Sequence, residues 1–431
     1  MLVIISVESQ AREWESQTIL AAELAKFGCT VLVADDQFLM RNIAKIASHT
    51  EEEILLIDKS ASISCLPKRI IPLLNSNKKS SAVVLFQEGW LADPAPTPVI
   101  QLYTAQDASK YVEKFFVFGM DQARKLDQTN ESLSSRIRLT GSPRFDLPLS
   151  FRDAYTVRRA AISELIGEYS LITDPFVSAP QSGRWMDALV PPLWHADPRN
   201  KGQLKKFLEK YVSQTEQASR LFIDYSKRLI TSNPEMFFVY RAHPGSSEST
   251  ARETFKGLSN VRIDKSFSSD LWIASARFVF THVCTTALQT QLWSSDSLKI
   301  FDFDHPYLLG LLGSLLKEIS QHKAAVDNPC SVNLADPELL SNVGYAHKVI
   351  AKEILDSSRS DRDYSEPMKI LAVIEKLREV DVIKFGPAPS WKWGQLEPMT
   401  DPLLKKYCSI NEAKLGQRVL SNSVMLMWSI K

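Results

Sequence analysis

The sequence predicts an α/β protein with two parallel-sheet domains, and three observations support this. Its 431 residues are more than one hydrophobic core usually holds. Short apolar runs alternate with helical patterns along most of the chain, which is the arrangement of βα units. The runs are continuously apolar, as expected for parallel strands covered on both faces. Apolar residues make up 44% of the chain and charged residues 23%, which is usual for a globular protein.

We place the first domain at residues 1–160 and expect six strands in it. A helix over residues 17–27 should follow the first strand and end at Gly28, a suitable C-cap residue. A charged helix over residues 150–167 should lead to the second domain. The six expected strands are residues 2–7, 30–34, 54–57, 82–86, 115–118 and 137–140.

The second domain is expected at residues 161–395, and its pattern restarts with a strand at residues 169–173. A loop rich in Pro, Trp, Asp and Gly should cover residues 174–202, before a long amphipathic helix near 204–231. Residues 396–431 form a tail, whose helix near 411–427 should cross back onto the first domain. The remaining expected strands are residues 236–240, 261–263, 278–281 and 298–303.

Charge and cysteine content exclude several classes of protein. Lys and Arg number 51 against 50 for Asp and Glu, so neither a nucleic-acid footprint nor a polybasic membrane anchor is indicated. The apolar start before Glu8 is too short for a signal peptide, and no later segment is apolar enough to span a bilayer. We therefore expect a cytoplasmic protein. Its five scattered cysteines contain no CxxC pair, so free thiols are expected rather than disulfides or a zinc site.

Several motifs that would indicate other activities are missing from the sequence. There is no GxxxxGK[ST], no GxGxxG and no GxSxG, so kinase, Rossmann dehydrogenase and serine hydrolase functions lack support. Asp302, Asp304 and His305 lie together, but a strand-end loop explains them better than a metal site. We therefore predict no metal and no other cofactor.

Polar residues follow several expected strands, at the edge where parallel sheets bind ligands. Glu88 could act as a general base, and the neighbouring Gly89 would allow a substrate to approach closely. Asp146 could act as a nucleophile or base, and Arg144 could bind a carboxylate or phosphate. The structural alternatives are an N-cap or turn acid at Glu88 and an Arg144–Asp146 clamp that holds the interdomain hinge.

A third charged set, Glu8, Arg12 and Glu13, follows the first strand. These residues could contact the acceptor substrate. A solvated helix start explains the same pattern almost as well.

In the second domain, candidate anion-binding residues follow two strands. A histidine before proline can donate a hydrogen bond to a phosphate oxygen, and a nearby arginine adds charge. The threonine-rich segment that follows begins a helix, whose free N–H groups attract anions. The alternatives are a core or capping histidine and an ordinary threonine N-cap. The candidates are Arg241, His243, Pro244, His282, Thr285 and Thr286.

An ordered set of motifs resembles the bacterial family of surface carbohydrate biosynthesis proteins. The set runs from Glu8 and Arg12-Glu13 through Phe118-Gly119 and Asp121-Gln122 to Gly141-Ser142-Pro143-Arg144-Phe145-Asp146, His243-Pro244 and Thr285-Thr286. It is similar to GT-B glycosyltransferases that use CMP-sugars, including β-Kdo transferases. The likeness covers about residues 2–303, and its GxPRFD element is the most distinctive part.

The resemblance implies a GT-B-like fold whose second domain holds the donor nucleotide in an interdomain cleft, with no bound metal. His243 and the helix start at Thr285 would bind the CMP phosphate, Glu88 would supply a catalytic carboxylate, and Asp146 would face the anomeric carbon. Since a Kdo-type donor also carries a carboxylate, Arg144 or Arg241 would provide a second anion contact. The acceptor would be a surface polysaccharide or a lipid-linked glycan, the latter met at the inner face of the membrane.

The sequence departs from the family at two points. One acid stands in the Gln87-Glu88-Gly89 element where relatives often have two, and Asp174-Pro175 stands where Asn and a small residue are more usual. Three alternatives therefore stay open: a CDP-glycerol-type polyol-phosphate transferase, a UDP-sugar 2-epimerase, and a non-catalytic binding module of the same fold.

Overall fold

The computed structural model describes two compact units, and each is treated by itself. Unit 1 comprises Met1–Gln87, Tyr103–Ala154 and Leu340–Lys431, and unit 2 comprises Glu88–Leu102 and Tyr155–Leu339. The described residues from 340 onward lie in unit 1, whereas the second domain was expected to extend to residue 395. The described residues are 1–62, 65–86, 104–105, 107–176, 201–243, 246, 248–266, 268–282, 284–301, 340–355, 369–370, 372–377, 415–421 and 424–429.

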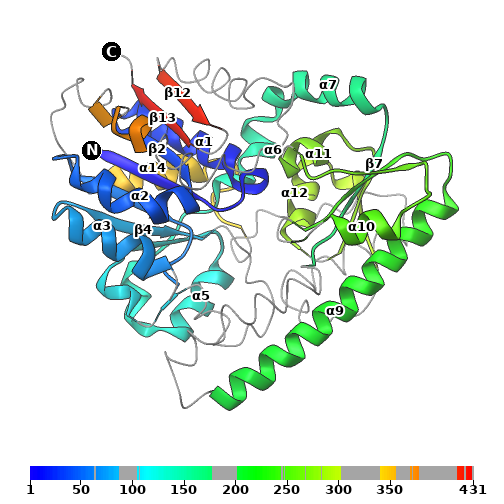
Figure 1. Ribbon diagram of the computed structural model, residues 1–431, viewed down its shortest axis with the longest axis horizontal. Helices are drawn as coiled ribbons and strands as arrows, with labels where there is room; N and C mark the ends of the chain where they lie inside the picture. Colours follow the sequence, from blue (N-terminus) through cyan, green and yellow to red (C-terminus); the bar gives the residue numbers. More distant parts are fainter. Residues whose placement is uncertain are drawn as a thin grey trace. The chain divides into compact units, whose positions relative to one another are not determined.

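Unit 1 is built on an eight-stranded sheet in the order β12-β13-β2-β1-β3-β4-β5-β6 (Figure 1). The strands from β1 to β6 are parallel, and β1 is buried along its whole length. This confirms the expected parallel sheet. The strands are β1 (Leu2–Val7), β2 (Thr30–Asp35), β3 (Ile54–Asp58), β4 (Ser81–Leu85), β5 (Lys114–Val117), β6 (Ile137–Leu139), β12 (Leu415–Ser421) and β13 (Val424–Ser429).

The prediction of a helix near residues 411–427 is wrong, because β12 and β13 form an antiparallel hairpin there. The second strand of the hairpin pairs antiparallel with β2, from Val424↔Ala34 to Met427↔Val31. Met425, Leu426 and Met427 are all buried, as in a strand covered on both faces. A short apolar run of this kind has no period that separates a helix from a strand. The segment does return to the first unit, but as part of its sheet.

The first helix, α1 (Gln10–Lys26), starts well before the expected residue 17. It is buried on nearly every side, with Glu15, Gln17 and Glu23 as inaccessible as its apolar residues. The next helix, α2 (Asp36–Ser48), is capped by Asp35, whose carboxylate accepts the Phe38 N–H at 2.8 Å. The other helices and turns of unit 1 are η1 (Leu66–Ile70), α3 (Ile71–Ser76), η2 (Ala108–Lys110), α5 (Met120–Thr129), η3 (Glu131–Arg136), η4 (Pro143–Phe145), α6 (Leu147–Ser150) and α14 (Ala346–Leu355).

Unit 2 contains a five-stranded parallel sheet in the order β11-β10-β7-β8-β9. All five strands match expected ones, and α9 covers the long helix predicted near 204–231. The strands are β7 (Ser170–Thr173), β8 (Phe238–Arg241), β9 (Val261–Ile263), β10 (Val279–Thr281) and β11 (Leu298–Ile300). The helices and turns are η5 (Arg152–Tyr155, at the boundary), α7 (Thr156–Ile166), α9 (Lys201–Ser232), α10 (Ser249–Thr254), α11 (Ser269–Ser275), α12 (Thr285–Trp293) and η7 (Ser295–Ser297).

The two faces of the unit 2 sheet have different neighbours. Ile172 and Tyr240 belong to the core that includes Phe222 of α9. Side chains alternate between the faces along a strand, so residues next to Ile172 and Tyr240 point to the other face. Tyr169 shows what covers that face, because it donates its hydroxyl to the Trp272 carbonyl of α11 at 2.8 Å. Thr173 and Arg241 therefore lie on the α11 face of the sheet.

Each sheet reverses its strand order at one place. In unit 1 the chain moves from β1 to β2 on one side, and then to β3, β4, β5 and β6 on the other. In unit 2 it moves from β7 to β8 and β9, and then crosses to β10 and β11. Ligands of parallel sheets bind beyond the carboxyl ends of the strands at such a switch point. The two places of interest are therefore the ends of β1 and β3, and the ends of β7 and β10.

Among the residues described, no helix combines the length and the apolar character needed to cross a bilayer.

Candidate functional site

The switch point of unit 2 contains the start of α12. Its neighbour Thr281, the last residue of β10, donates its hydroxyl to the Thr173 carbonyl of β7 at 3.1 Å. The N-cap residue Cys284 is extended and makes no side-chain cap, and the first turn contains no acidic residue. Thr285 and Thr286 are partly exposed there. An uncapped helix start with hydroxyl donors and no acid favours a bound anion.

Two of the predicted anion-binding residues lie at the end of β8 in the same unit: Arg241 is its last residue, and His243 comes two residues later. Arg241 is buried, and its guanidinium donates to the Ser266 carbonyl at 2.6 Å and lies 5.8 Å from the Trp272 ring. Burial lowers the pKa of Arg241 to about 10, which still leaves it charged at neutral pH. His243 is partly exposed, and its carbonyl accepts the Ser246 N–H at 2.8 Å. The structure thus places His243 two residues beyond a buried positive charge.

His282 is located differently from the other predicted phosphate ligands. Its Nδ1 lies 3.0 Å from the Phe301 carbonyl oxygen, and its ring centroid is 5.9 Å from that of Phe176. Both phenylalanines belong to the core on the α9 face. This environment fits the core-histidine alternative.

Asp174 directly follows β7 and was assigned by the sequence analysis to a loop. Its carboxylate accepts the Tyr240 hydroxyl at 2.8 Å and the Phe176 N–H at 2.9 Å. Burial raises the pKa of Asp174 from 3.8 to about 7, and the two hydrogen bonds oppose this shift only in part. A carboxyl group that titrates near neutral pH at a switch point is a candidate functional group. Its position after a predicted strand was the signal that could have found it.

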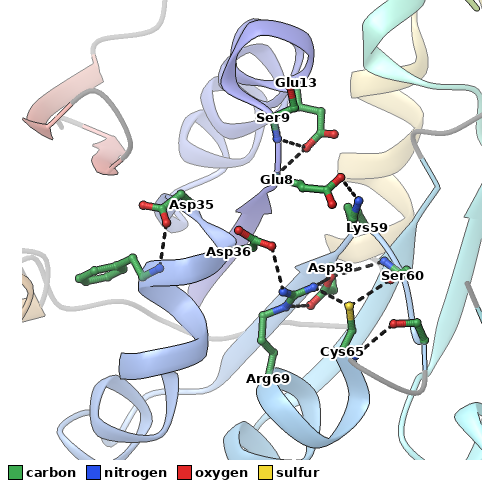
Figure 2. A network of polar contacts seen from close by, with 12 residues as sticks. Glu8, Ser9, Glu13, Asp35, Asp36, Asp58, Lys59, Ser60, Cys65 and Arg69 are labelled. Atoms are coloured by element: carbon green, nitrogen blue, oxygen red, sulfur yellow. Dashed lines mark hydrogen bonds and ion pairs between the residues drawn. The ribbon is translucent and has the colours of Figure 1, made fainter. Parts of the chain in front are cut away.

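The switch point of unit 1 carries the predicted residues Glu8, Arg12 and Glu13 in one network, and Figure 2 shows Glu8 and Glu13 with Lys59. Glu13 is fully buried, and it accepts the Glu8 N–H at 2.8 Å and pairs with the Arg12 guanidinium at 2.7 Å. Glu8 is exposed and forms ion pairs with Arg12 at 3.4 Å and with Lys59, which follows β3. The structure therefore brings this predicted set together and adds Lys59 to it.

A second part of the network was missed by the sequence analysis. Arg69 binds Asp58 through two short contacts, 2.6 and 2.8 Å, and both side chains are buried. Its guanidinium also donates to the Cys65 sulfur at 2.9 Å and lies 3.6 Å from an oxygen of Asp36 (Figure 2). Burial raises the pKa of Asp36 from 3.8 to about 6, with Arg69 opposing the shift and Glu8 adding to it. Asp36 and Asp58 stand beside the ends of β2 and β3, so a search beyond every predicted strand would have found them.

The carboxylate of Asp146 accepts hydrogen bonds from the start of α14. It is fully buried and accepts the backbone N–H groups of Ala346 and His347 at 3.1 and 2.9 Å, at the start of α14. The His347 Nδ1 lies 2.7 Å from the same carboxylate. This arrangement resembles a helix cap at the start of α14. Arg144 is also buried, in η4.

Several predicted residues lie outside the described part of the chain, namely Glu88, Gly89, Pro244, Asp302, Asp304 and His305. Within the described part, no group of three or more His, Cys, Asp or Glu side chains could hold a metal ion.

Neither a family model nor a curated protein matches the sequence, whereas solved structures show a distant likeness. The UDP-GlcNAc 2-epimerase of Methanocaldococcus jannaschii, solved with UDP-GlcNAc and UDP, has a TM-score of 0.45 and 10% identity, over 83% of this chain and all of that one. HepE of Anabaena, solved with UDP and glucose, has a TM-score of 0.38 and 10% identity, over 88% and 99%. A variant of the wall teichoic acid polymerase TagF has a TM-score of 0.43 and 9% identity, over 83% and 88%.

Proposed function

We propose that the protein is a GT-B-type glycosyltransferase that binds a nucleotide sugar at the switch point of unit 2. The observation that carries this proposal is the start of α12, which is uncapped, free of acids in its first turn and placed beside the end of β7. A nucleotide phosphate is the anion such a helix start suits in an α/β unit. Thr285, Thr286 and His243 would contact the phosphate, and Arg241 would add a buried positive charge behind it.

The donor and the chemistry rest on the sequence resemblance. By that resemblance the donor is a CMP-sugar, with Kdo or a related keto-sugar, and the acceptor is a surface polysaccharide or glycolipid. Glu88 would take the proton of the attacking acceptor hydroxyl, whose oxygen displaces CMP from the anomeric carbon. Because the carboxylate of Asp146 already binds the start of α14, we assign the proton transfer to Glu88.

The charges of unit 1 suit the acceptor better than the nucleotide. Glu8 is exposed at the end of β1 and Asp36 is partly exposed after β2, and with Glu13 and Asp58 they outnumber the basic residues Arg12, Lys59 and Arg69, each of which is paired with a carboxylate. Carboxylates accept hydrogen bonds from sugar hydroxyl groups, and they repel phosphates. The anionic part of the substrate therefore belongs at unit 2.

Calorimetric titration with CMP, CDP and UDP tests the donor assignment, with His243→Ala as the variant. We expect CMP to bind, and the substitution to weaken it at least about tenfold (~1.4 kcal/mol). His49→Ala is the matched control, since His49 is exposed at the end of α2 in unit 1. A preference for CDP would favour polyol-phosphate transfer, and a preference for UDP would favour an epimerase or a UDP-sugar transferase. Absence of binding would leave the non-catalytic module as the better hypothesis.

Turnover of Glu88→Ala tests the catalytic part. A transferase should lose rate by orders of magnitude while still binding the nucleotide. Equal turnover of the variant and the wild type would remove Glu88 from the mechanism.

A further inference from the structure

Thr173 ends β7, the central strand of the unit 2 sheet, at the switch point. Tyr169, four residues before Thr173, points to the same face of the sheet, and its hydroxyl donates a hydrogen bond to α11. In the register of the sheet, Thr173 lies beside Arg241 of β8. Its carbonyl oxygen accepts the Thr281 hydroxyl from β10, the strand that leads into α12. The Thr173 side chain therefore lies on the α11 face, at the edge from which α12 begins.

The hydroxyl group of Thr173 is buried and lacks a hydrogen bond. The residue is only 8% exposed, and its Oγ1 has no partner anywhere in the described chain. Removing a hydroxyl group from water without a replacement bond costs free energy, so natural proteins rarely leave one in this state. A bound ligand that accepts its hydrogen bond would offset that cost.

The surroundings select the chemistry of such a ligand. The α12 start presents backbone N–H groups, the Thr285 and Thr286 hydroxyls stand in its first turn, and Arg241 contributes a positive charge on the same face. All of these groups favour an acceptor that carries negative charge. We infer that the Thr173 hydroxyl is a further ligand-positioning group, which donates a hydrogen bond to a phosphate oxygen bound at the start of α12. This deepens the proposed function and rests on its nucleotide site.

The inference makes an unusual pair of predictions for Thr173→Val, which removes the hydroxyl and keeps the shape. The affinity for CMP, CDP or UDP, whichever the wild type binds, should fall at least about tenfold. The Tm of the ligand-free protein should rise by about 2–4 °C, because an unpaired buried hydroxyl is gone. Thr173→Ser keeps the hydroxyl and should keep most of the affinity.

Thr215→Val is the matched control. Thr215 lies on α9 in the same unit, is also 8% exposed, and its Oγ1 likewise has no partner within the described residues. It lies on α9, the helix that packs on the opposite face of the sheet from Thr173. Its substitution should raise the Tm in the same way and leave nucleotide affinity unchanged.

Calorimetry and thermal unfolding of these variants, with inorganic pyrophosphate as an additional probe, decide the question. Unchanged nucleotide affinity in Thr173→Val, or a lower Tm, would overturn the inference and leave the proposed function standing. If the wild type binds pyrophosphate but no nucleotide, and Thr173→Val weakens that binding, the proposed function fails while the oxyanion contact is supported. If the wild type binds neither, both fall.

Discussion

The carboxyl group of Asp174 should make the stability of unit 2 depend on pH, and Asp174→Asn should remove that dependence. The pKa of Asp174 is about 7 in the folded protein against 3.8 as its ordinary value. Between these values the folded state holds a proton that the unfolded chain has released. The stability this proton contributes is complete below about pH 4 and is lost as the pH rises through 7. Each pH unit is worth about 1.4 kcal/mol, so raising the pH from 5 to 8 should cost the wild type about 3 kcal/mol through this group.

An asparagine at this position cannot ionise. Its Oδ1 can still accept the Phe176 N–H, and its NH₂ group can donate to the Tyr240 hydroxyl, which accepts as well as donates. Unfolding of the wild type and Asp174→Asn should be compared at pH 5, 6, 7 and 8, with hydrogen exchange of the β7 and β8 peptides to report on unit 2 alone. The variant should gain about 3 kcal/mol on the wild type across this range. Asp36 titrates in the same direction, but it is common to both proteins and cancels.

The control is Asp224→Asn, at an exposed position on α9, which should follow the wild-type profile. Parallel profiles for wild type and Asp174→Asn would refute the reasoning, since they would mean that the folded state holds no extra proton there.

Three further substitutions test other parts of unit 1. Asp58→Asn leaves the buried guanidinium of Arg69 without its closest carboxylate and should cost about 3–5 kcal/mol of unfolding free energy in urea, so a loss below about 1 kcal/mol would contradict that ion pair. Asp146→Asn should cost about 2 kcal/mol by weakening the α14 cap, with little effect on nucleotide affinity; lost turnover at unchanged stability would instead indicate catalysis. Gly141→Ala should prevent folding or cost several kcal/mol, because its Cβ would lie 2.1 Å from a carbonyl oxygen. Gly167→Ala, with a similar positive φ and open space around it, should cost about 1–3 kcal/mol through its backbone angles alone, so equal thermal shifts would show that the backbone angle alone decides.

The parallel strands could be predicted because their apolar runs are continuous and bounded by polar residues. All eleven strands from β1 to β11 lie within a few residues of their expected positions. The start of α1 could not be predicted in this way, because the helix is buried on nearly every side and Glu15 and Gln17 interrupt its apolar pattern. The prediction for the β12–β13 hairpin failed for another reason. Its pairing with β2 depends on residues almost a whole chain length away, which no local window contains.

The candidate site was predicted only in part. Residues after the first strand were found, and the structure joins Glu8, Arg12 and Glu13 as a network. Sequence position alone could not show that the carboxylate of Asp146 caps the start of α14, because that helix begins some two hundred residues later. Nor could it show that the Thr173 hydroxyl is buried without a partner, since burial depends on the helices packed over the sheet.

The hairpin that completes the unit 1 sheet also sets an order of events during synthesis. The described strands of unit 2 lie in one continuous stretch of chain, so they can pair while the ribosome is still working. Unit 1 cannot do so, because β13, which covers the edge of β2, follows all the other described strands in the sequence. Until then the growing chain carries an open strand edge, which other chains could join. A nascent protein of this design therefore has a reason to depend on chaperones until its final strands emerge.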